Sequence, residues 1–320
     1  MKSIIILIFS LLCLNTMTIA KPSWQQWVAE LKIEAVRQGI NPDMFDRIFR
    51  AIPEPDHKVM SFDKSQPEHR ITFLEYRNTR ADKYKIFIGR REYELHKAIL
   101  EEIGDAYHVD PCAVVALWGM ESSYGHYMGH FPVIKSLATL AYDARRGERF
   151  RKELLLALQI VNQGQISIDK FKGEWAGASG QPQFLPSSWF KYAVDYDNDG
   201  RKDIWTSDTD SLASIANYLA KNGWQYDEPA AVQVILPAHF PKQLMGKKIK
   251  KTVSTWNELG VRTLSGADLS YPDLQASVIQ LEGGTTFLIY NNFNVIMTYN
   301  FSSYYAATIA YLSDQICKKG

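Results

Sequence analysis

The feature that most constrains the fold is a change of hydrophobic pattern near Pro229. Before it, apolar residues recur mostly at helical spacing, and after it come short runs of β-type sequence separated by turn residues. These runs are 231–236, 277–280 and 286–290, and a helical pattern returns at 302–316. The chain is therefore predicted to be α+β and mainly α, with a small β-rich domain ahead of a last helix that packs back on the helical region.

The expected helices fall into an N-terminal and a middle group. An apolar stripe at helical spacing, predicted to be core, opens the first group; it consists of Trp24, Trp27, Val28, Leu31 and Ala35. A helix follows at 43–51, then a polar connection at 53–66 and helical sequence to about 102. Middle helices are expected at 111–122, 133–146, 149–162, 186–193 and 211–222. The predicted domains are 21–100 (helical), 101–228 (core), 229–296 (β-rich) and 297–320 (last helix).

Residues 1–20 have the layout of a secretory signal peptide, with Lys2, an apolar run at 4–12 and a small residue, Ala20. The apolar run is shorter than the ~20 residues of a spanning helix. Cys13 follows two leucines rather than the small residue that a lipoprotein signal requires, so no lipid anchor is expected. The sequence predicts an exported protein.

Charge and cysteine content exclude some classes of protein. Lys2 is the only charged residue of the signal segment, so the remaining chain has equal numbers of basic and acidic residues, and no nucleic-acid partner is expected. Only Cys112 and Cys317 remain outside the segment, too few for a disulfide scaffold. In an exported protein they could pair, but the sequence leaves this open.

Glu121 is the first candidate catalytic residue. The segment DPCAVVALWGMESSYG begins with Asp110 as a helix cap and Pro111 in the first turn, which places Glu121 in the last turn. Its carboxyl then lies on the face of Leu117 and Trp118. Apolar neighbours and the negative end of the helix dipole both raise a carboxyl pKa, and a protonated carboxyl is a suitable general acid. On this evidence alone, a purely structural glutamate remains an alternative.

Several long motifs in order make the chain resemble the lytic murein transglycosylase B family, periplasmic enzymes that cut peptidoglycan on a lysozyme-like core. The motifs are SQPE at 65–68, WGMESSYG at 118–125, FKGEWAGASGQPQFLPSS at 171–188, YAVDYDNDG at 192–200 and TYN at 298–300. The resemblance implies that Glu121 is the sole catalytic acid and base. Ordinary glycosidases need two carboxylates. Here Glu121 would protonate the oxygen between N-acetylmuramic acid and N-acetylglucosamine, then deprotonate the muramyl C6 hydroxyl as a 1,6-anhydro ring closes.

The same resemblance implies a saccharide groove. Gln183, Tyr218, Tyr299 and Asn300 match glycan-contacting residues of the family. Two positions depart from its pattern: Glu174 stands where the family often has a sugar-contacting serine, and Ser179 where methionine is usual. Glu174 could therefore place a second acid near the groove.

An acidic loop predicts calcium. Asp195, Asp197 and Asp199 alternate ahead of Gly200, as in the first half of an EF-hand loop, but the twelfth position is Thr206. The residues alone leave open a solvated loop in which Asp210 caps the next helix. The family has a calcium loop with a displaced closing acid, which implies Asp210 here, with Asp208 as the rival, and the backbone carbonyl of Arg201 as a ligand. The cation's expected role is structural.

The expected enzyme is thus a periplasmic, monomeric lyase without an organic cofactor. Its expected partner is the peptidoglycan glycan strand, with peripheral association with the cell envelope as a further expectation. A basic run, comprising Lys247, Lys248, Lys250 and Lys251, is either a solvated face or an attraction to anionic polymer. Two alternatives stay open: a hydrolytic muramidase, and a calcium-stabilised cell-wall binding protein without turnover.

Overall fold

The computed structural model describes residues 21–64, 71–143 and 146–318. The expected signal peptide at 1–20 and the SQPE motif at 65–68 lie outside this part of the chain. Within it, no helix combines the length and the apolar character needed to cross a membrane.

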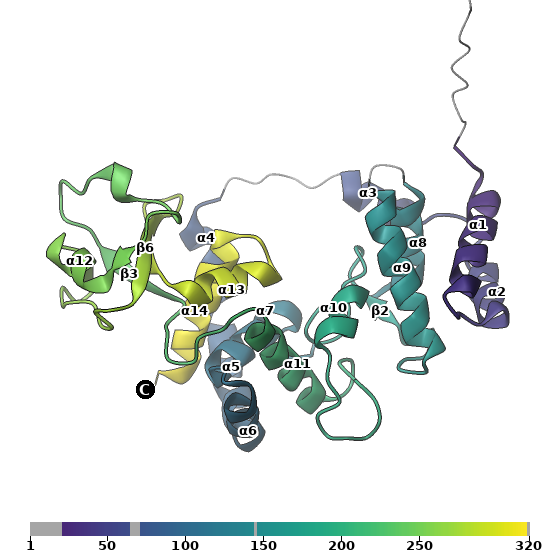
Figure 1. The fold of residues 1–320 in the computed structure, drawn as a ribbon, viewed down its shortest axis with the longest axis horizontal. Helices are drawn as coiled ribbons and strands as arrows, with labels where there is room; N and C mark the ends of the chain where they lie inside the picture. The colour runs from purple at the N-terminus through teal and green to yellow at the C-terminus, as the bar shows by residue number, and fades with distance from the viewer. Residues whose placement is uncertain (1–20, 65–70, 144–145, 319–320) are drawn as a thin grey trace, which may run out of the picture.

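One helical body, at the right of Figure 1, combines the start of the chain with part of its middle. Its helices share a single apolar core. They are α1 (Trp24–Arg37), α2 (Pro42–Arg50), α3 (His57–Lys64), α8 (Val133–Tyr142), α9 (Gly147–Asn162) and α10 (Pro186–Tyr192). The predicted core stripe is confirmed, since Trp24, Trp27, Leu31 and Ala35 are buried and Val28 packs against them.

A second helical body, left of centre in Figure 1, has its own core. Its helices are α4 (Phe73–Arg80), α5 (Lys83–Leu95), α6 (Lys97–Tyr107), α7 (Pro111–Ser122), α11 (Asp208–Lys221), α13 (Asn291–Tyr299) and α14 (Ser303–Cys317). The segment expected to form one N-terminal helical domain, 21–100, therefore contributes to both cores. The reason is physical: each short helix buries only one apolar stripe, and the partners for these stripes come from later helices.

The β-rich part forms a five-stranded antiparallel sheet in the order β4-β6-β7-β3-β5. Its elements are β3 (Ala231–Ile235), η1 (Lys242–Leu244), β4 (Lys251–Thr252), α12 (Val253–Glu258), β5 (Arg262–Thr263), β6 (Gln275–Gln280) and β7 (Thr286–Ile289). A separate core forms around Trp256. The sequence predicted β3, β6 and β7 but neither the two-residue strands nor α13, which crosses the expected boundary at 296. A further antiparallel pair consists of β1 (Phe131–Pro132) and β2 (Lys172–Gly173), with β2 beside α10 in Figure 1.

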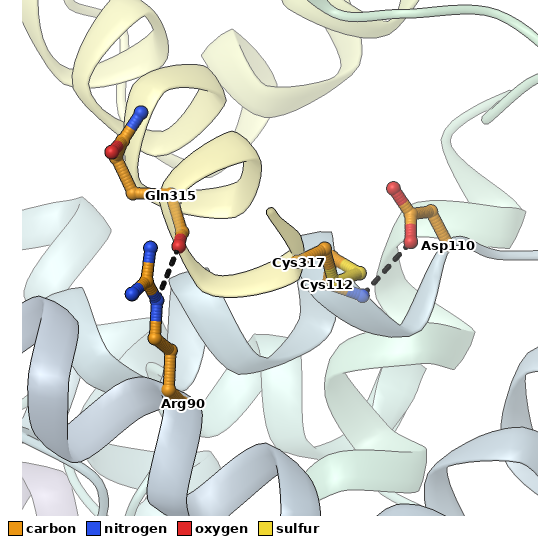
Figure 2. The surroundings of a disulfide bond; sticks show 5 residues. All are labelled: Arg90, Asp110, Cys112, Gln315 and Cys317. Atoms are coloured by element: carbon orange, nitrogen blue, oxygen red, sulfur yellow. Dashed lines mark hydrogen bonds between the residues drawn. A yellow bond between two sulfur atoms is a disulfide. The ribbon is translucent and has the colours of Figure 1, made fainter. Parts of the chain in front are cut away.

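A disulfide joins Cys112 to Cys317 and answers the question that the sequence left open. It connects the start of α7 to the end of α14, with the two Cα atoms 6.1 Å apart (Figure 2). Nearby, the Cys112 amide donates to Asp110 Oδ1 at 2.9 Å, and Arg90 Nε donates to the Gln315 carbonyl at 2.8 Å. Helix α14 is thus fastened along α7, as the prediction of a last helix packing back on the core requires.

Candidate active site

Helix α7 places Glu121 at the junction between core and surface. It spans the predicted residues Pro111–Ser122, with the Asp110 carboxylate accepting from the Cys112 amide as its N-terminal cap. Every residue from 113 to 119 is buried. The helix ends because Ser123 and Tyr124 adopt positive φ angles of 51° and 61°. Glu121 is partly buried in the last turn, so its carboxyl has an apolar background and a route to the surface.

The contacts of Glu121 suit a carboxyl that gains and loses a proton. The Tyr305 hydroxyl donates a hydrogen bond to Glu121 Oε1. Burial raises the pKa of Glu121 to about 7, although the Tyr305 hydrogen bond and the charge of Lys85 both lower it. The Lys85 ammonium itself donates to the Gly119 carbonyl at 2.8 Å and to Ser123 Oγ at 3.2 Å. Lys85 therefore donates hydrogen bonds to the C-terminal end of helix α7 and does not form an ion pair with Glu121.

Sequence reasoning missed Tyr305 and Lys85. Both come from distant segments, α14 and α5, so no local spacing connects them to Glu121. A weak signal existed for Tyr305, because it lies in the first turn of the predicted last helix, just after the TYN motif. For Lys85 we find no such signal.

Two predicted groove residues lie in an aromatic layer beside Glu121. The rings of Tyr218 and Tyr299 have centroids 4.5 Å apart, and the centroid of each ring lies 5.9 Å from that of the Phe184 ring. The Tyr299 hydroxyl donates to the Pro182 carbonyl at 2.5 Å. Burial raises the pKa of both tyrosines, and the Glu121 charge adds to the shift, which places them within its electrostatic reach. Asn300 follows at the end of α13 and is exposed.

The glycine-rich loop after β2 carries the other two predicted contacts. Gln183 has a left-handed φ of 51°, and its amide donates to the carbonyls of Met128 at 3.1 Å and Gly180 at 2.9 Å. Glu174 is partly exposed at the start of the loop. A side chain at Gly129 would collide with the Gly173 backbone, so the loop that follows Glu121 packs closely on this one. The structure thus brings Gln183 to the Glu121 region, while it gives no contact between Glu174 and Glu121.

A series of hydrogen-bonded side chains connects this loop to helix α7. Trp118 Nε1 donates to Gln181 Oε1 at 2.6 Å, and Gln181 Nε2 donates to Asp208 Oδ1 at 2.8 Å. The other oxygen of Asp208 lies 3.3 Å from His96 Nε2. Trp118 is one turn before Glu121, so these hydrogen bonds fix the position of the glycine-rich loop relative to the candidate acid.

The acidic loop gathers three carboxylates. Ligand atoms of Asp195, Asp197 and Asp210 lie within 4.8 Å of one another. Asp210 is 0% exposed, and its two oxygens accept from the amides of Tyr196 and Asp203, both at 2.8 Å. Burial raises the pKa of Asp210, and the charge of Asp197 adds to the shift. Oxygens crowded in this way fit a hard cation such as calcium.

The remaining predicted ligands differ in position. Asp208 is held by Gln181 and His96 instead, so the geometry favours Asp210 over its rival. The Asp199 carboxylate accepts from the Arg201 amide at 2.8 Å and is not one of the three grouped acids. The Arg201 guanidinium contacts the Gln165 carbonyl and Asp203. A metal role for Asp199 and for the Arg201 carbonyl stays a prediction.

Known proteins resemble this chain over most of its length. The family model described as transglycosylase SLT domain (SLT_2) matches residues 23–314. Membrane-bound lytic murein transglycosylase B of Escherichia coli K12 is 31% identical over 307 residues, which cover 92% of this chain and 82% of that protein.

Solved structures resemble the fold over similar lengths. SltB3 from Pseudomonas aeruginosa, in complex with NAG-NAM-pentapeptide, superposes with a TM-score of 0.89 at 40% identity, over 93% of this chain and 80% of that one. E. coli lytic transglycosylase Slt35, in complex with calcium, gives 0.75 at 27% identity, over 93% of both chains. These relatives confirm the mainly α, α+β fold class and the resemblance drawn from the motifs. The chain belongs to the SLT_2 family of transglycosylase domains, together with lytic murein transglycosylase B.

Proposed function

We propose that this protein is a peptidoglycan lytic transglycosylase in which Glu121 acts first as the acid and then as the base. The observation that carries the proposal is the Glu121 carboxyl, whose pKa burial raises to about 7, at the end of an apolar helix beside a pair of packed tyrosine rings. A group with this pKa populates both protonation states at neutral pH, so it can serve each step in turn.

In the first step the protonated Glu121 carboxyl donates to the oxygen that links N-acetylmuramic acid to N-acetylglucosamine, and the bond to the muramyl anomeric carbon breaks. The carboxylate left behind keeps its hydrogen bond from Tyr305. That bond and the Lys85 charge favour the ionised form, which limits how far burial can raise the pKa. Tyr305 and Lys85 are thus positioning residues that set the balance between acid and base.

In the second step the Glu121 carboxylate takes the proton of the muramyl C6 hydroxyl. The hydroxyl oxygen then bonds to the anomeric carbon, the 1,6-anhydro ring closes, and Glu121 is protonated again. The sugar's 2-acetamido group or nearby dipoles stabilise the positive centre between the two steps. No water is consumed, which is the difference from a hydrolytic muramidase.

The groove residues would hold the strand across Glu121. Tyr218 and Tyr299 offer aromatic faces, Asn300 offers an exposed amide, and the Gln183 side chain, whose nitrogen is held by the Met128 and Gly180 carbonyls, offers its amide oxygen as an acceptor for a sugar hydroxyl. Glu174 would add an acceptor at a position where the family often has serine. The SltB3 complex with NAG-NAM-pentapeptide supports a glycan strand as the substrate.

Calcium would bind to Asp195, Asp197 and Asp210 and stabilise the fold rather than take part in the reaction. The fit rests on the crowded oxygens and on Asp210, which two backbone amides hold in place. The Slt35 complex with calcium supports the choice of cation. Bound calcium would neutralise the mutual repulsion of these carboxylates.

The proposed location is the periplasm, where the substrate lies. The Cys112–Cys317 disulfide supports this, because such bonds persist in oxidising compartments. The protein would act as a monomer, with peripheral association with the cell envelope and without a lipid anchor.

Mass spectrometry of digested sacculi tests the proposed activity. The expected products carry 1,6-anhydromuramyl ends, and Glu121→Gln should release none above background. Reducing muramyl ends from the wild-type enzyme would identify a hydrolase. Failure of the wild type to release any fragment, despite binding sacculi, would identify a non-catalytic wall-binding protein.

A further inference from the structure

Four side chains from four different segments form a closed set of contacts one helical turn before Glu121. His96, at the junction of α5 and α6, lies nearly perpendicular to the Trp118 ring, with 5.3 Å between the ring centroids. Its Nε2 lies 3.3 Å from Asp208 Oδ2, and the other oxygen of Asp208 accepts from Gln181 at 2.8 Å. Gln181 in turn accepts from Trp118 Nε1 at 2.6 Å, which closes the set. These four side chains are called the His96 network below, and all but Asp208 are mostly buried.

The direction of each hydrogen bond in the His96 network follows from one group that can only donate. The Trp118 indole N–H donates to the Gln181 oxygen, so the Gln181 amide nitrogen must face an acceptor, which is the Asp208 carboxylate. An ionised carboxylate can only accept, so His96 Nε2 must carry a proton. The Nδ1 atom of the same ring lies 3.0 Å from the Glu92 carbonyl, which also can only accept. Both ring nitrogens therefore donate, and the geometry requires an imidazolium cation.

The charged groups around His96 suit a cation. Asp208 of α11 faces Nε2, and the Glu92 carboxylate of α5 lies 3.8 Å from Nδ1. The Arg91 guanidinium pairs with the other oxygen of Glu92 at 2.7 Å, so it leaves the Asp208 charge to His96. Trp118 of α7 contributes an aromatic ring without a charge. The His96 side chain, which is 16% exposed, therefore lies between two carboxylates in a largely buried place.

The loop that the His96 network holds is the one expected to contact the glycan strand. The residue after Gln181 presents its carbonyl to the Tyr299 hydroxyl at 2.5 Å, and the residue after that is Gln183. A Cβ atom at Gly125 would lie 2.8 Å from Gln181 Oε1, so the chain that follows Glu121 packs directly on Gln181. A shift of Gln181 would therefore displace neighbouring residues that are expected to bind the strand.

We propose that His96 is a positioning residue of the active site: as a donor to Asp208 it fixes Gln181, and with Gln181 the glycan contacts of the glycine-rich loop. The inference rests on the proposed function, because it requires that this loop bind the strand. His96 acts through Asp208 and Gln181 and does not touch the reacting atoms. Its contribution is therefore to substrate binding, while the acid and base steps at Glu121 proceed without it.

Steady-state kinetics on soluble glycan strands provide the first test. His96→Leu removes both donors and should raise KM about tenfold, while kcat stays within about twofold. A merely structural role would reduce the fraction of active enzyme, which lowers kcat and leaves KM unchanged. His96→Gln, whose amide can still donate to Asp208, should bring KM back to within about twofold of the wild type. His239→Leu, at an exposed position in the β-rich domain, is the control that should change neither constant.

Nitrogen-15 NMR of the wild type, with His96→Gln to assign the signal, provides a second test that needs no stable leucine variant. Both ring nitrogens of His96 should carry a proton at the pH of the assay. A neutral ring would overturn the proposal, as would an unchanged KM in His96→Leu or equal KM values in the leucine and glutamine variants. Each of these results leaves wild-type cleavage intact. Failure of the proposed function would differ, because the wild type would then release no 1,6-anhydromuramyl product.

Discussion

Glu121 and Asp210 are both carboxyls withdrawn from water, yet their surroundings suit them for opposite purposes. Glu121 accepts a hydrogen bond from Tyr305 and senses the charge of Lys85, yet burial still raises its pKa to about 7. Asp210 shares its space with Asp195 and Asp197. A lone carboxyl is neutralised by a proton, which can be passed on, whereas three crowded carboxylates suit a cation that stays.

The supporting contacts differ in the same way. Glu121 accepts from a side chain of α14, 184 residues away, and depends on how two helices pack. Asp210, in the first turn of α11, accepts from backbone amides of the preceding loop, only 7 and 14 residues away. The proposed catalytic site is therefore built by tertiary packing, and the proposed metal site by local chain geometry.

The largest expected effect is that of Glu121→Gln, which should lower turnover at least about 10³-fold, because general acid and base assistance are both lost. The same change should stabilise the fold at alkaline pH. The folded pKa lies above the ordinary 4.5, so the wild type loses stability as pH rises from about 4.5 to about 7. Above pH 7 the variant should be more stable by on the order of 2 kcal/mol. Unfolding curves at pH 4 and 8 measure this, and a variant less stable at pH 8 would contradict it.

Removal of the disulfide should be next in size. The bond closes a separation of 205 residues, and replacing both Cys112 and Cys317 with serine should lower the free energy of unfolding by about 3–5 kcal/mol. Because the bond fastens α14 to α7, turnover should fall while calcium affinity is unchanged. Thermal unfolding and calcium titration of the variant provide the two measurements. If calcium affinity fell as much as turnover, the Glu121 site and the acidic loop would not be structurally independent.

Calcium should stabilise the protein by about 2.7 kcal/mol at a concentration one hundred times its Kd. Asp210→Asn should abolish the response, and Asp208→Asn, whose carboxylate faces Gln181 and His96, should keep it. Melting with calcium and with chelator, together with calorimetry, checks this. Equal melting temperatures with calcium and with chelator, together with no heat of binding, would show that the protein does not bind calcium.

Tyr305→Phe should have the smallest effect, about tenfold on kcat/KM. The hydrogen bond from Tyr305 favours the Glu121 carboxylate, so its loss should raise the pKa of Glu121 by about one unit. The fall of activity at alkaline pH, where the acid form is lost, should move upward by the same amount. Tyr304→Phe is the matched control, since its hydroxyl donates to the Ile71 carbonyl instead. An unshifted profile in Tyr305→Phe would show that this hydroxyl does not act on Glu121.

The sequence predicted the features that local chain geometry determines, and it missed those that depend on tertiary packing. Helix α7 begins and ends where its cap, its first-turn proline and its polar end predict, because these signals are local. The acidic loop was visible for the same reason. Tyr305 and Lys85 were not, since their contacts depend on how α14 and α5 pack on α7. The two-residue strands β4 and β5 are too short to show an alternating hydrophobic pattern. The hydrophobic periodicity of the helices within 21–100 predicts that they are helices but not which later helices they pack against.

The central claim is that the fold keeps the Glu121 carboxyl protonated up to neutral pH. Carbon-13 NMR of protein labelled at the glutamate side-chain carboxyl, with Glu121→Gln to assign the signal, measures this directly. We predict one glutamate signal that titrates with a pKa of about 7 and is absent from the variant. A Glu121 signal that titrates near the ordinary value of 4.5 would contradict the account.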